Sequence, residues 1–495
     1  MALDPRTPVI VGVAQRTWRD GDAPDPIEMC AEVVSAAAAD AGAGDRLLKR
    51  AGSLATVDIA SRRWADPAAL VAARLGLAPA ETLRTELGGD GPLLLLSDIA
   101  ARIAAGRLDA GVICGAEALA TLSRAVRSGD EPPWTELDDG AAPSRVLGSA
   151  RAPASDAELA ANLIAPVVVY PLFEHALWAR SGLSLNAHRA RLGDLWSGLS
   201  HTAAHNPYAW SPRALGGDVI ATPAPGNRLV TQTYTKLLNS NIQTDQAAAL
   251  IVCSAELAGA LGIARERWVF PLATAHANDH WLVSERDDLV SSPAIRHAGA
   301  RVLAHAGVGM DDVAALDLYS CFPSAVQIAA AELGVDAFAD RRPLTLTGGL
   351  TFAGGPGNNY VTHSVAAMVE RLRGTEDVGL LNAVGWYLTK HAVGAFSGRP
   401  GPRPYAAATV QPQVDAGPRR AVAIGTTGPA TGESASLVYD RDGRPAVASI
   451  TALLSDGRRA LAKTDDAETL LALADAPLTA RPVTLGAAGT FALTG

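Results

Sequence analysis

The sequence contains few cysteines, few aromatic side chains and little charge, and each shortage excludes a class of protein. Its 495 residues include only four cysteines, none spaced as a CxxC pair: Cys30, Cys114, Cys253 and Cys321. We therefore expect no disulfide framework, zinc finger or iron–sulfur site, and this cysteine usage fits a reducing compartment. Aromatic residues make up 5% of the chain, charged residues 19% and hydrophobic residues 48%, which indicates a folded chain with a large core.

A long apolar segment and an excess of basic residues are also missing. No stretch reaches the roughly 18 consecutive apolar residues that a membrane-spanning helix needs, and the longest apolar run, 163–173, contains two prolines. Residues 1–6 show no basic region followed by an apolar stretch, so no signal peptide is expected. The 42 basic and 51 acidic residues give a net charge of −9, which provides no broad attraction for nucleic acid or anionic lipid. We expect a cytoplasmic protein with no membrane span and no nucleic-acid partner.

Familiar catalytic and metal-binding motifs are absent as well. The chain has no GxxxxGK[ST] loop, no GxGxxG after its first predicted strand, no HExxH and no GxSxG. Two histidine pairs have the i, i+4 spacing, His201/His205 and His276/His280, but neither has a usefully spaced third ligand. No metal site is therefore expected.

What is present is an alternation of apolar strands and helices over the first 120 residues. The pattern predicts strands at 9–14, 55–60 and 110–115, and helices from Pro26 to Gly42 and over 92–105. Such an alternation favours a mainly parallel sheet with helices on both faces. The pattern returns after residue 270, with helices over 292–306, 324–333 and 359–373 and strands over 315–320 and 378–385. We expect an α/β protein with two similar halves, 1–255 and 256–400, the first including a loop domain at about 120–245.

The composition changes after a Pro/Gly-rich stretch at 397–404, which predicts a linker. Residues 405–495 contain short strand-like segments and one short helix, with hairpin turns at Asp442-Gly443 and Asp456-Gly457. We expect a small, mostly β domain there, a five-stranded OB-like barrel. Its basic side chains do not gather with aromatic ones as in a platform that stacks nucleic-acid bases.

Four glycine-rich or polar loops follow the predicted strands. They are Leu87–Pro92, Asp317–Phe322, Thr347–Asn359 and Asn382–Trp386. In doubly wound sheets ligands bind at the loops beyond the strand ends. Glycines there let the backbone approach a ligand, and helix N-termini offer N–H donors to anionic or oxyanion groups. The sequence therefore predicts a ligand site where these loops meet.

The order of these loops resembles that of the thiolase superfamily over residues 1–400, with a likeness to the sterol-carrier-protein-type thiolases. The third loop lies where those enzymes carry Gly-Gly and then Gly-His-Pro, and the residues after 405 are similar to the extra C-terminal domain of thiolase-like proteins of type 1. The resemblance implies a duplicated five-layer α/β/α/β/α core with a small C-terminal β domain. The segments that carry it are Val9–Gly12, Asn206–Trp210, Lys236–Gln246, Tyr319–Phe322 and Gly348–Pro356.

The positions that carry thiolase chemistry are all replaced. Thiolases form an acyl-enzyme on a cysteine at the N-terminus of a buried helix, and the resemblance places that position on Gly89. The activating histidine falls on Gly355, the acid/base cysteine near Ala383, and the Asn or His of the second loop on Tyr319. The resemblance therefore implies a fold with an acyl-CoA cleft but without the two-step thiolase mechanism.

Three side chains are candidates for a remaining catalytic role. Tyr319 can donate a proton to a developing enolate or alkoxide, or accept one if its pKa is lowered, and thiolase-like retro-aldolases without the cysteine also have a tyrosine at this loop. The alternative is a buried tyrosine that fills a lost site. His391, after the fourth loop, and His363, in the helix after the third, offer a base or are structural histidines.

The predicted ligand contacts come from the same loops. We expect Asp90 to act either as a helix cap or as a base. Cys321 lies within the motif of the second loop, and we expect it to be a packing residue. The glycines provide either backbone N–H donors or tight turns. The predicted set is Gly88, Gly89, Asp90, Cys321, Gly354, Gly355, Pro356, Asn358 and Gly385.

Three functions follow as hypotheses. The leading one is a thiolase-like acyl-CoA-binding protein of lipid metabolism, an acetyl-CoA acetyltransferase homologue without its nucleophile, with coenzyme A or an acyl-CoA as ligand and no bound cofactor. The second is a carbon–carbon lyase, a retro-aldolase on β-hydroxyacyl-CoA esters, that uses Tyr319. The third is a non-catalytic scaffold or binding protein that acts through residues 405–495. A homodimer and a protein partner for the terminal domain both stay open.

Overall fold

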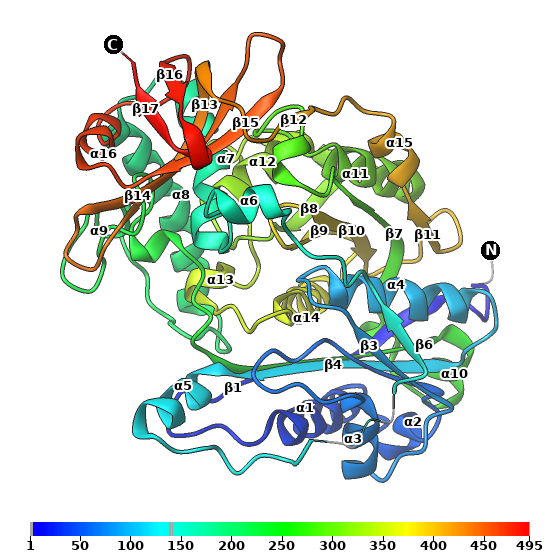
Figure 1. Cartoon of the computed structure of the whole chain (residues 1–495). Helices are drawn as coiled ribbons and strands as arrows, with labels where there is room; N and C mark the ends of the chain where they lie inside the picture. The colour runs from blue at the N-terminus through cyan, green and yellow to red at the C-terminus, as the bar shows by residue number, and fades with distance from the viewer. Residues whose placement is uncertain (1–2, 138–139, 141, 495) are drawn as a thin grey trace.

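The core of the protein contains two stacked sheets, seen in a computed structural model that describes residues 3–137, 140 and 142–494 (Figure 1). In the first sheet β2, β3, β4 and β5 run parallel to one another, whereas β6 lies antiparallel between β1 and β4. Strands β1 to β5 therefore share one direction and β6 runs against them, so the sheet is mainly parallel, as predicted. Its order is β1 (Pro8–Thr17), β6 (Asp245–Ser254), β4 (Ala110–Ala118), β2 (Ser53–Thr56), β3 (Glu81–Thr85) and β5 (Arg145–Leu147).

The second sheet includes three strands that the sequence analysis did not predict. These are β7, β10 and β11: β7 pairs with β10 and β11, and β10 also pairs with the predicted strand 378–385. The strand predicted at 315–320 is found at 313–317 and pairs with 378–385. Strand β11 follows the Pro/Gly-rich stretch, so residues 406–409 belong to this core sheet rather than to the terminal sheet. The order is β11 (Ala406–Thr409), β7 (Phe270–Asn278), β10 (Lys390–Ser397), β9 (Val378–Gly385) and β8 (Val313–Asp317).

Helices complete a five-layer core (Figure 1). Helices α1 (Pro26–Asp40) and α3 (Pro67–Arg74) pack on the outer face of the first sheet, with α2 (Asp45–Leu48) beside them. Between the sheets lie α4 (Gly91–Ala104) and α14 (Tyr360–Leu372), which contact strands of both. The outer face of the second sheet is covered by α11 (Pro293–Ala306), with α12 (Pro323–Glu332) next to it. The α/β/α/β/α order places the N-termini of α4 and α12 and the loop before α14 near the middle of the molecule.

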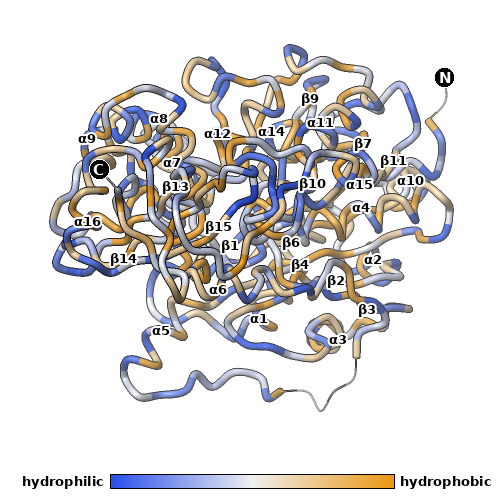
Figure 2. The backbone as a smooth tube through the Cα atoms, turned by 45° about the horizontal axis from the view of Figure 1, so that its top comes forward, coloured by the Kyte–Doolittle hydropathy of each residue, from blue (hydrophilic) through white to orange (hydrophobic). Residues whose placement is uncertain are grey.

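A helical loop region joins β4 to β6. Apolar stretches concentrate along the central strands, whereas the chain after α5 is largely hydrophilic and runs along the periphery (Figure 2). Among the described residues no helix is both long and apolar enough to cross a bilayer. The helices of this region are α5 (Leu119–Ser128), α6 (Asp156–Ala160), α7 (Pro166–Ser181), α8 (Leu185–His205) and α9 (Gly217–Ala221).

The terminal segment forms a third sheet of six strands, one more than we expected, and a bridge between Lys463 and Thr490 brings β17 back to β15. The OB-like barrel itself stays a prediction. The hairpin turns at Gly443 and Gly457 occur as predicted, with φ of 79° and 83°. The two last strands are only four and three residues long, too short for a clear sequence pattern. The order is β12 (Val422–Ala423), β15 (Arg459–Thr464), β14 (Pro445–Leu453), β13 (Gly428–Tyr439), β16 (Pro482–Leu485) and β17 (Phe491–Leu493), with α16 (Ala467–Leu473) packed on β14.

Candidate functional site

The predicted loops meet in the structure. The Gly88 backbone N–H donates to Asn358 Oδ1 at 3.0 Å, and Asn358 Nδ2 donates to the Asp58 carbonyl at 3.1 Å. The Tyr319 N–H donates to Asn382 Oδ1 at 2.9 Å. The first loop is thereby joined to the third, and the second to the fourth, as expected for loops at neighbouring strand ends.

Gly89 lies directly against Tyr319. A Cβ atom on Gly89 would come closer than 3.0 Å to the Tyr319 hydroxyl oxygen and to the Val384 carbonyl oxygen. Such separations are sterically forbidden, and the carbonyl belongs to the backbone of β9. The phenol of Tyr319 thus occupies the space that any side chain at residue 89 would need.

Tyr319 is buried and protonated. Its ring packs edge-on against Tyr360, with centroids 5.5 Å apart and an interplanar angle of 85°. Burial, reinforced by the neighbouring Cys321, raises the pKa of the Tyr319 phenol well above its usual range. At neutral pH this phenol can donate a hydrogen bond or a proton, but it does not act as a phenolate base.

Cys321 belongs to an apolar and aromatic cluster formed with α7. The Tyr170 ring from α7 stacks on Phe322 at 4.3 Å, and its hydroxyl donates to the Trp386 carbonyl at 2.9 Å. Burial raises the pKa of the Cys321 thiol to about 12, so the reactive thiolate is not populated at neutral pH. This environment is that of a packing cysteine.

The third loop contains no substitute for the missing histidine. The Gly355 N–H donates to the Asn241 carbonyl at 2.8 Å. A Cβ atom on Gly355 would meet that carbonyl oxygen at 3.3 Å and Leu350 at 3.5 Å, so the position has some room. Gly354 has a φ of 108° and lies against Gln246, and the Pro356 carbonyl accepts from the Asn359 N–H at 2.9 Å. These residues shape the loop through their backbone.

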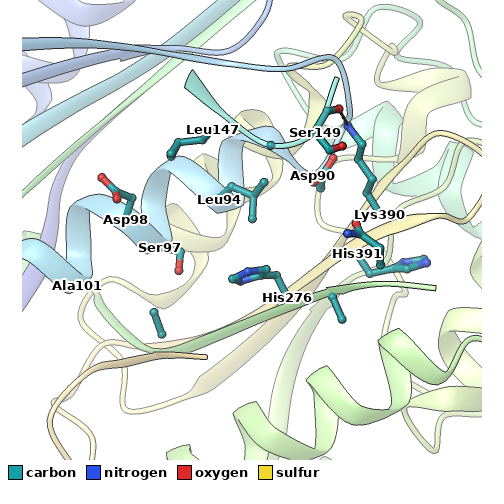
Figure 3. Close-up of a pocket in the computed structure, with 14 residues that line it drawn as sticks. Asp90, Leu94, Ser97, Asp98, Ala101, Leu147, Ser149, His276, Lys390 and His391 are labelled. Atoms are coloured by element: carbon teal, nitrogen blue, oxygen red, sulfur yellow. Dashed lines mark hydrogen bonds between the residues drawn. The ribbon is translucent and has the colours of Figure 1, made fainter. Parts of the chain in front are cut away.

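His391 points away from Gly89. Successive side chains of a strand face opposite sides, so Lys390 faces the Gly88 side while His391 faces the start of α11 (Figure 3). There His391 Nε2 lies 3.1 Å from Asp279 Oδ2 and 3.5 Å from Ser292 Oγ. The role that we predicted for His391 as a base at the loops is not supported by this geometry.

His363 lies on the other side of the third loop. Its Nδ1 is 3.0 Å from Gln15 Oε1, and among the described residues its Nε2 has no hydrogen-bond partner. Burial lowers the pKa of His363 to about 3, so the ring is neutral at ordinary pH. With Gly354 and Tyr360 it lines a void of only about 10 Å³, which leaves little space for a substrate.

A larger cavity of about 480 Å³ begins at the first loop and at the start of β10 (Figure 3). Asp90 and Lys390 lie at one end of it, and His276 projects from β7 toward α4. The sequence analysis missed Lys390 and His276 as site residues. A lysine and a histidine in segments 390–397 and 270–278, which consist mostly of apolar or small residues, could have pointed to a polar site there. The lining residues are Asp90, Leu94, Ser97, Asp98, Ala101, Leu147, Gly148, Ser149, His276, Ala277, Asn278, Lys390, His391 and Ala407.

Comparisons with known proteins agree with this architecture. Residues 409–490 match the family model described as the thiolase-like protein type 1 additional C-terminal domain. A crystal structure of a monomeric SCP2-thiolase like protein type 1 from Mycobacterium smegmatis is 31% identical, and the match covers 100% of both chains with a TM-score of 0.85. The chain belongs to the thiolase-like protein type 1 family. This confirms both the resemblance drawn from the loops and the thiolase-type fold with an added C-terminal domain.

Two more distant similarities are to proteins named as enzymes. An acetyl-CoA acetyltransferase of Methanocaldococcus jannaschii is 23% identical over 271 residues, which are 54% of this chain and 60% of that enzyme's length. The structure of an Ltp2-ChsH2(DUF35) aldolase is 18% identical, with a TM-score of 0.57 over 80% of this chain and 99% of the other. At this identity the aldolase shows a shared fold alone.

Proposed function

We propose that this thiolase-like protein binds an acyl-CoA ester and does not catalyse cysteine-dependent thiolysis. The observation that carries the proposal is the Tyr319 hydroxyl, which fills the space of a side chain at Gly89. An acyl-enzyme needs a nucleophile at that point, and the four cysteines of the chain are all buried, at other positions. Binding of a CoA ester is supported by membership of a thiolase-like family and by the distant relation to an acetyl-CoA acetyltransferase.

Two assays on the full chain test the two parts of this proposal. We expect no CoA-dependent cleavage of acetoacetyl-CoA, and we expect the melting temperature to rise with acetyl-CoA, since a ligand that binds only the folded state stabilises it. Rapid thiolysis would overturn the first part. A panel of short- and medium-chain acyl-CoA esters that leaves the melting temperature unchanged would overturn the second.

A second candidate function is cleavage of a β-hydroxyacyl-CoA ester by a retro-aldol reaction. It is favoured by the protonated Tyr319 phenol, which stands where the thiolase nucleophile would act. In such a reaction water takes up the β-hydroxyl proton and the hydroxyl carbon becomes the carbonyl group of the released fragment. The electron pair of the broken carbon–carbon bond passes to the thioester as an enolate. Tyr319 would donate its proton to the enolate oxygen.

The test of this candidate is Tyr319→Phe, compared with Tyr439→Phe as a control at a half-buried tyrosine of the terminal sheet. If the wild-type protein cleaves a β-hydroxyacyl-CoA, we expect the rate to fall by about 10²–10⁴-fold in Tyr319→Phe and to stay unchanged in the control. An activity that survives Tyr319→Phe would exclude the proposed role.

A further inference from the structure

The cavity at Asp90 and Lys390 contains two charged groups that do not satisfy each other. Asp90 is 5% exposed and Lys390 is 2% exposed. Both side chains line the same 480 Å³ space, yet they form no ion pair within 4.0 Å among the described residues. Figure 3 shows them together near Ser149, at the N-terminal end of α4.

The Asp90 carboxylate accepts no hydrogen bond from a neighbouring described residue, and the donor beside it is its own backbone N–H. Asp90 is the N-cap residue of α4, but its side chain accepts no capping hydrogen bond, and none from another described residue. A Cβ atom on Gly88 or on Gly385 would each come closer than 3.0 Å to Asp90 Oδ1. Two glycines thus make the room that this carboxylate occupies. A buried carboxylate with so few donors is costly, which points to a further donor supplied by a ligand.

Lys390 retains one unused donor. Its Nζ donates to the Leu87 carbonyl at 2.7 Å and to the Ser149 carbonyl at 2.9 Å. An ammonium group has three N–H donors, so the third remains for a carbonyl or carboxylate oxygen in the cavity. The indole rings of Trp281 and Trp386, 5.9 and 6.0 Å from Nζ, limit where the amine can move.

Much of the remaining cavity wall is apolar, although Ser97, Asp98, Ser149 and Asn278 also line it. Leu94 and Ala101 face it from α4, Leu147 from β5 and Ala407 from β11. The His276 ring makes no hydrogen bond to a described residue, and burial lowers its pKa. The volume of about 480 Å³ lies in the range of roughly 300–1,000 Å³ that is usual for small-molecule sites. An alkyl chain of several carbons fits such a wall.

We infer that this cavity binds a small hydroxyacyl compound, an alkyl chain with a hydroxyl group close to a carboxylate or ester carbonyl. The hydroxyl donates to Asp90, the carbonyl or carboxylate oxygen accepts from Lys390 Nζ, and the chain lies along Leu94 and Leu147. The inference goes beyond the proposed function, because the cavity lies beside the Gly89–Tyr319 contact and the binding does not require a coenzyme A moiety.

Calorimetric titration of the full chain with 3-hydroxyoctanoate and octanoate tests this inference. We expect 3-hydroxyoctanoate to bind at least tenfold more tightly than octanoate in the wild type. Asp90→Asn should remove most of this preference, because the hydroxyl then meets an uncharged acceptor. Ala101→Leu, which extends into the cavity, should weaken both ligands by at least tenfold. Its control, Ala304→Leu on the exposed face of α11, should leave both affinities unchanged.

The variants also separate a ligand role from a structural one. Asp90→Asn removes a buried, unpaired carboxylate, so its melting temperature should equal or exceed that of the wild type. Equal affinity for both acids in the wild type would overturn the inference, and so would undiminished binding in Ala101→Leu. A clear loss of stability in Asp90→Asn with an unchanged preference for the hydroxy acid would assign Asp90 to the fold instead.

Discussion

At the scale of single residues, one glycine determines what the loops can do. Gly89 has only a hydrogen where Tyr319 and the backbone of β9 leave no further space. We expect Gly89→Ala to lower the free energy of unfolding by about 1–3 kcal/mol, the usual cost of an added group in a packed site. Urea unfolding of the wild type and the variant measures this change in the free energy of unfolding. Gly198→Ala in α8, where a Cβ atom would meet nothing within 4 Å, is the matched control and should be neutral or stabilising.

A second residue-scale prediction concerns Glu117 in β4. Its fully buried carboxylate accepts from the Ala60 and Ser61 N–H groups at 2.7 and 2.8 Å, and burial raises its pKa to about 7. The folded state therefore holds this proton more tightly than the unfolded state. Its contribution to stability is present below the unfolded pKa, near 4.5, and is lost as pH rises toward about 7.

We expect Glu117→Gln to lose this pH dependence, which for the wild type amounts to about 3 kcal/mol between the two pKa values. The measurement is the free energy of unfolding at several pH values from about 4.5 to about 7.5. If the free energies of unfolding of the wild type and of Glu117→Gln differ by the same amount at every pH, Glu117 does not titrate in this range.

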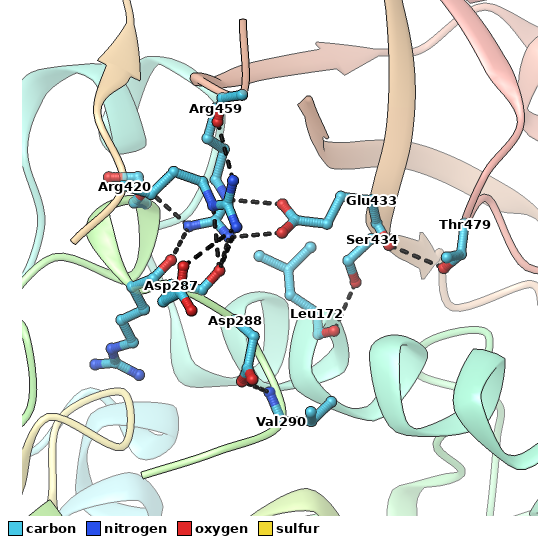
Figure 4. Close-up of polar contacts among 12 residues, drawn as sticks. Leu172, Asp287, Asp288, Val290, Arg420, Glu433, Ser434, Arg459 and Thr479 are labelled. Carbon is cyan, nitrogen blue, oxygen red and sulfur yellow. Dashed lines mark hydrogen bonds and ion pairs between the residues drawn. The ribbon is translucent and has the colours of Figure 1, made fainter. Parts of the chain in front are cut away.

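At the scale of elements, one arginine fixes β15 to the core (Figure 4). Arg459 is fully buried, and its guanidinium donates to both carboxylate oxygens of Glu433 at 2.6 Å and to the Ser284 carbonyl at 2.9 Å. The first partner lies in β13 of the same sheet, and the second lies in the core segment 283–285. This bidentate pair joins two strands of the terminal sheet to the thiolase-like core.

Arg459→Met should cost roughly 3–5 kcal/mol, because it leaves Glu433 without its partner at the interface. The adjacent Arg458→Met is the control, since Arg458 is exposed and its one ion pair among the described residues is with Asp456 in the hairpin turn. Thermal unfolding and the rate of limited proteolysis within 405–425 are the measurements. Equal melting temperatures for the two variants would show that the arginine pair does not hold the sheet.

At the scale of the whole molecule, the terminal sheet covers α7 of the loop region. Ser434 Oγ donates to the Leu172 carbonyl at 2.6 Å, and the Leu478 N–H donates to His175 Nε2 at 2.9 Å. Burial lowers the pKa of His175 to about 3, which keeps Nε2 available as an acceptor. The same helix presses Tyr170 onto Phe322 beside the candidate site. The added domain thus supports the wall of the site from outside.

Removal of residues 422–495 should lower the melting temperature of the remaining chain and promote its aggregation, because a buried face of α7 becomes exposed. Size-exclusion chromatography and thermal unfolding of the shortened chain measure this. A monomeric product with the melting temperature of the full chain would show that the sheet is an independent module.

The sequence by itself determined the features that depend on local patterns. Strand Val378–Gly385 has the predicted bounds, and α1 begins at Pro26 after the predicted Asp25 cap, whose side chain accepts from the Ile27 N–H. The loops were recognised because glycine and polar residues interrupt apolar runs. Asp90 stands at the N-cap of α4 as predicted, but its side chain makes no capping hydrogen bond, because the preference of aspartate for helix N-termini does not reveal whether its oxygens reach an N–H.

Only the tertiary structure decided which side chains meet. Three features depend on segments that lie far apart in the chain. They are the antiparallel pairing of β6 with β1 and β4, the opposite directions in which Lys390 and His391 point, and the contact of Tyr319 with Gly89. Apolar periodicity gives a residue's tendency to be buried but not its partner across a sheet or between layers. For this reason the glycine at residue 89 was readable from the sequence, whereas the phenol beside it and the cavity at Asp90 became visible only in the folded chain.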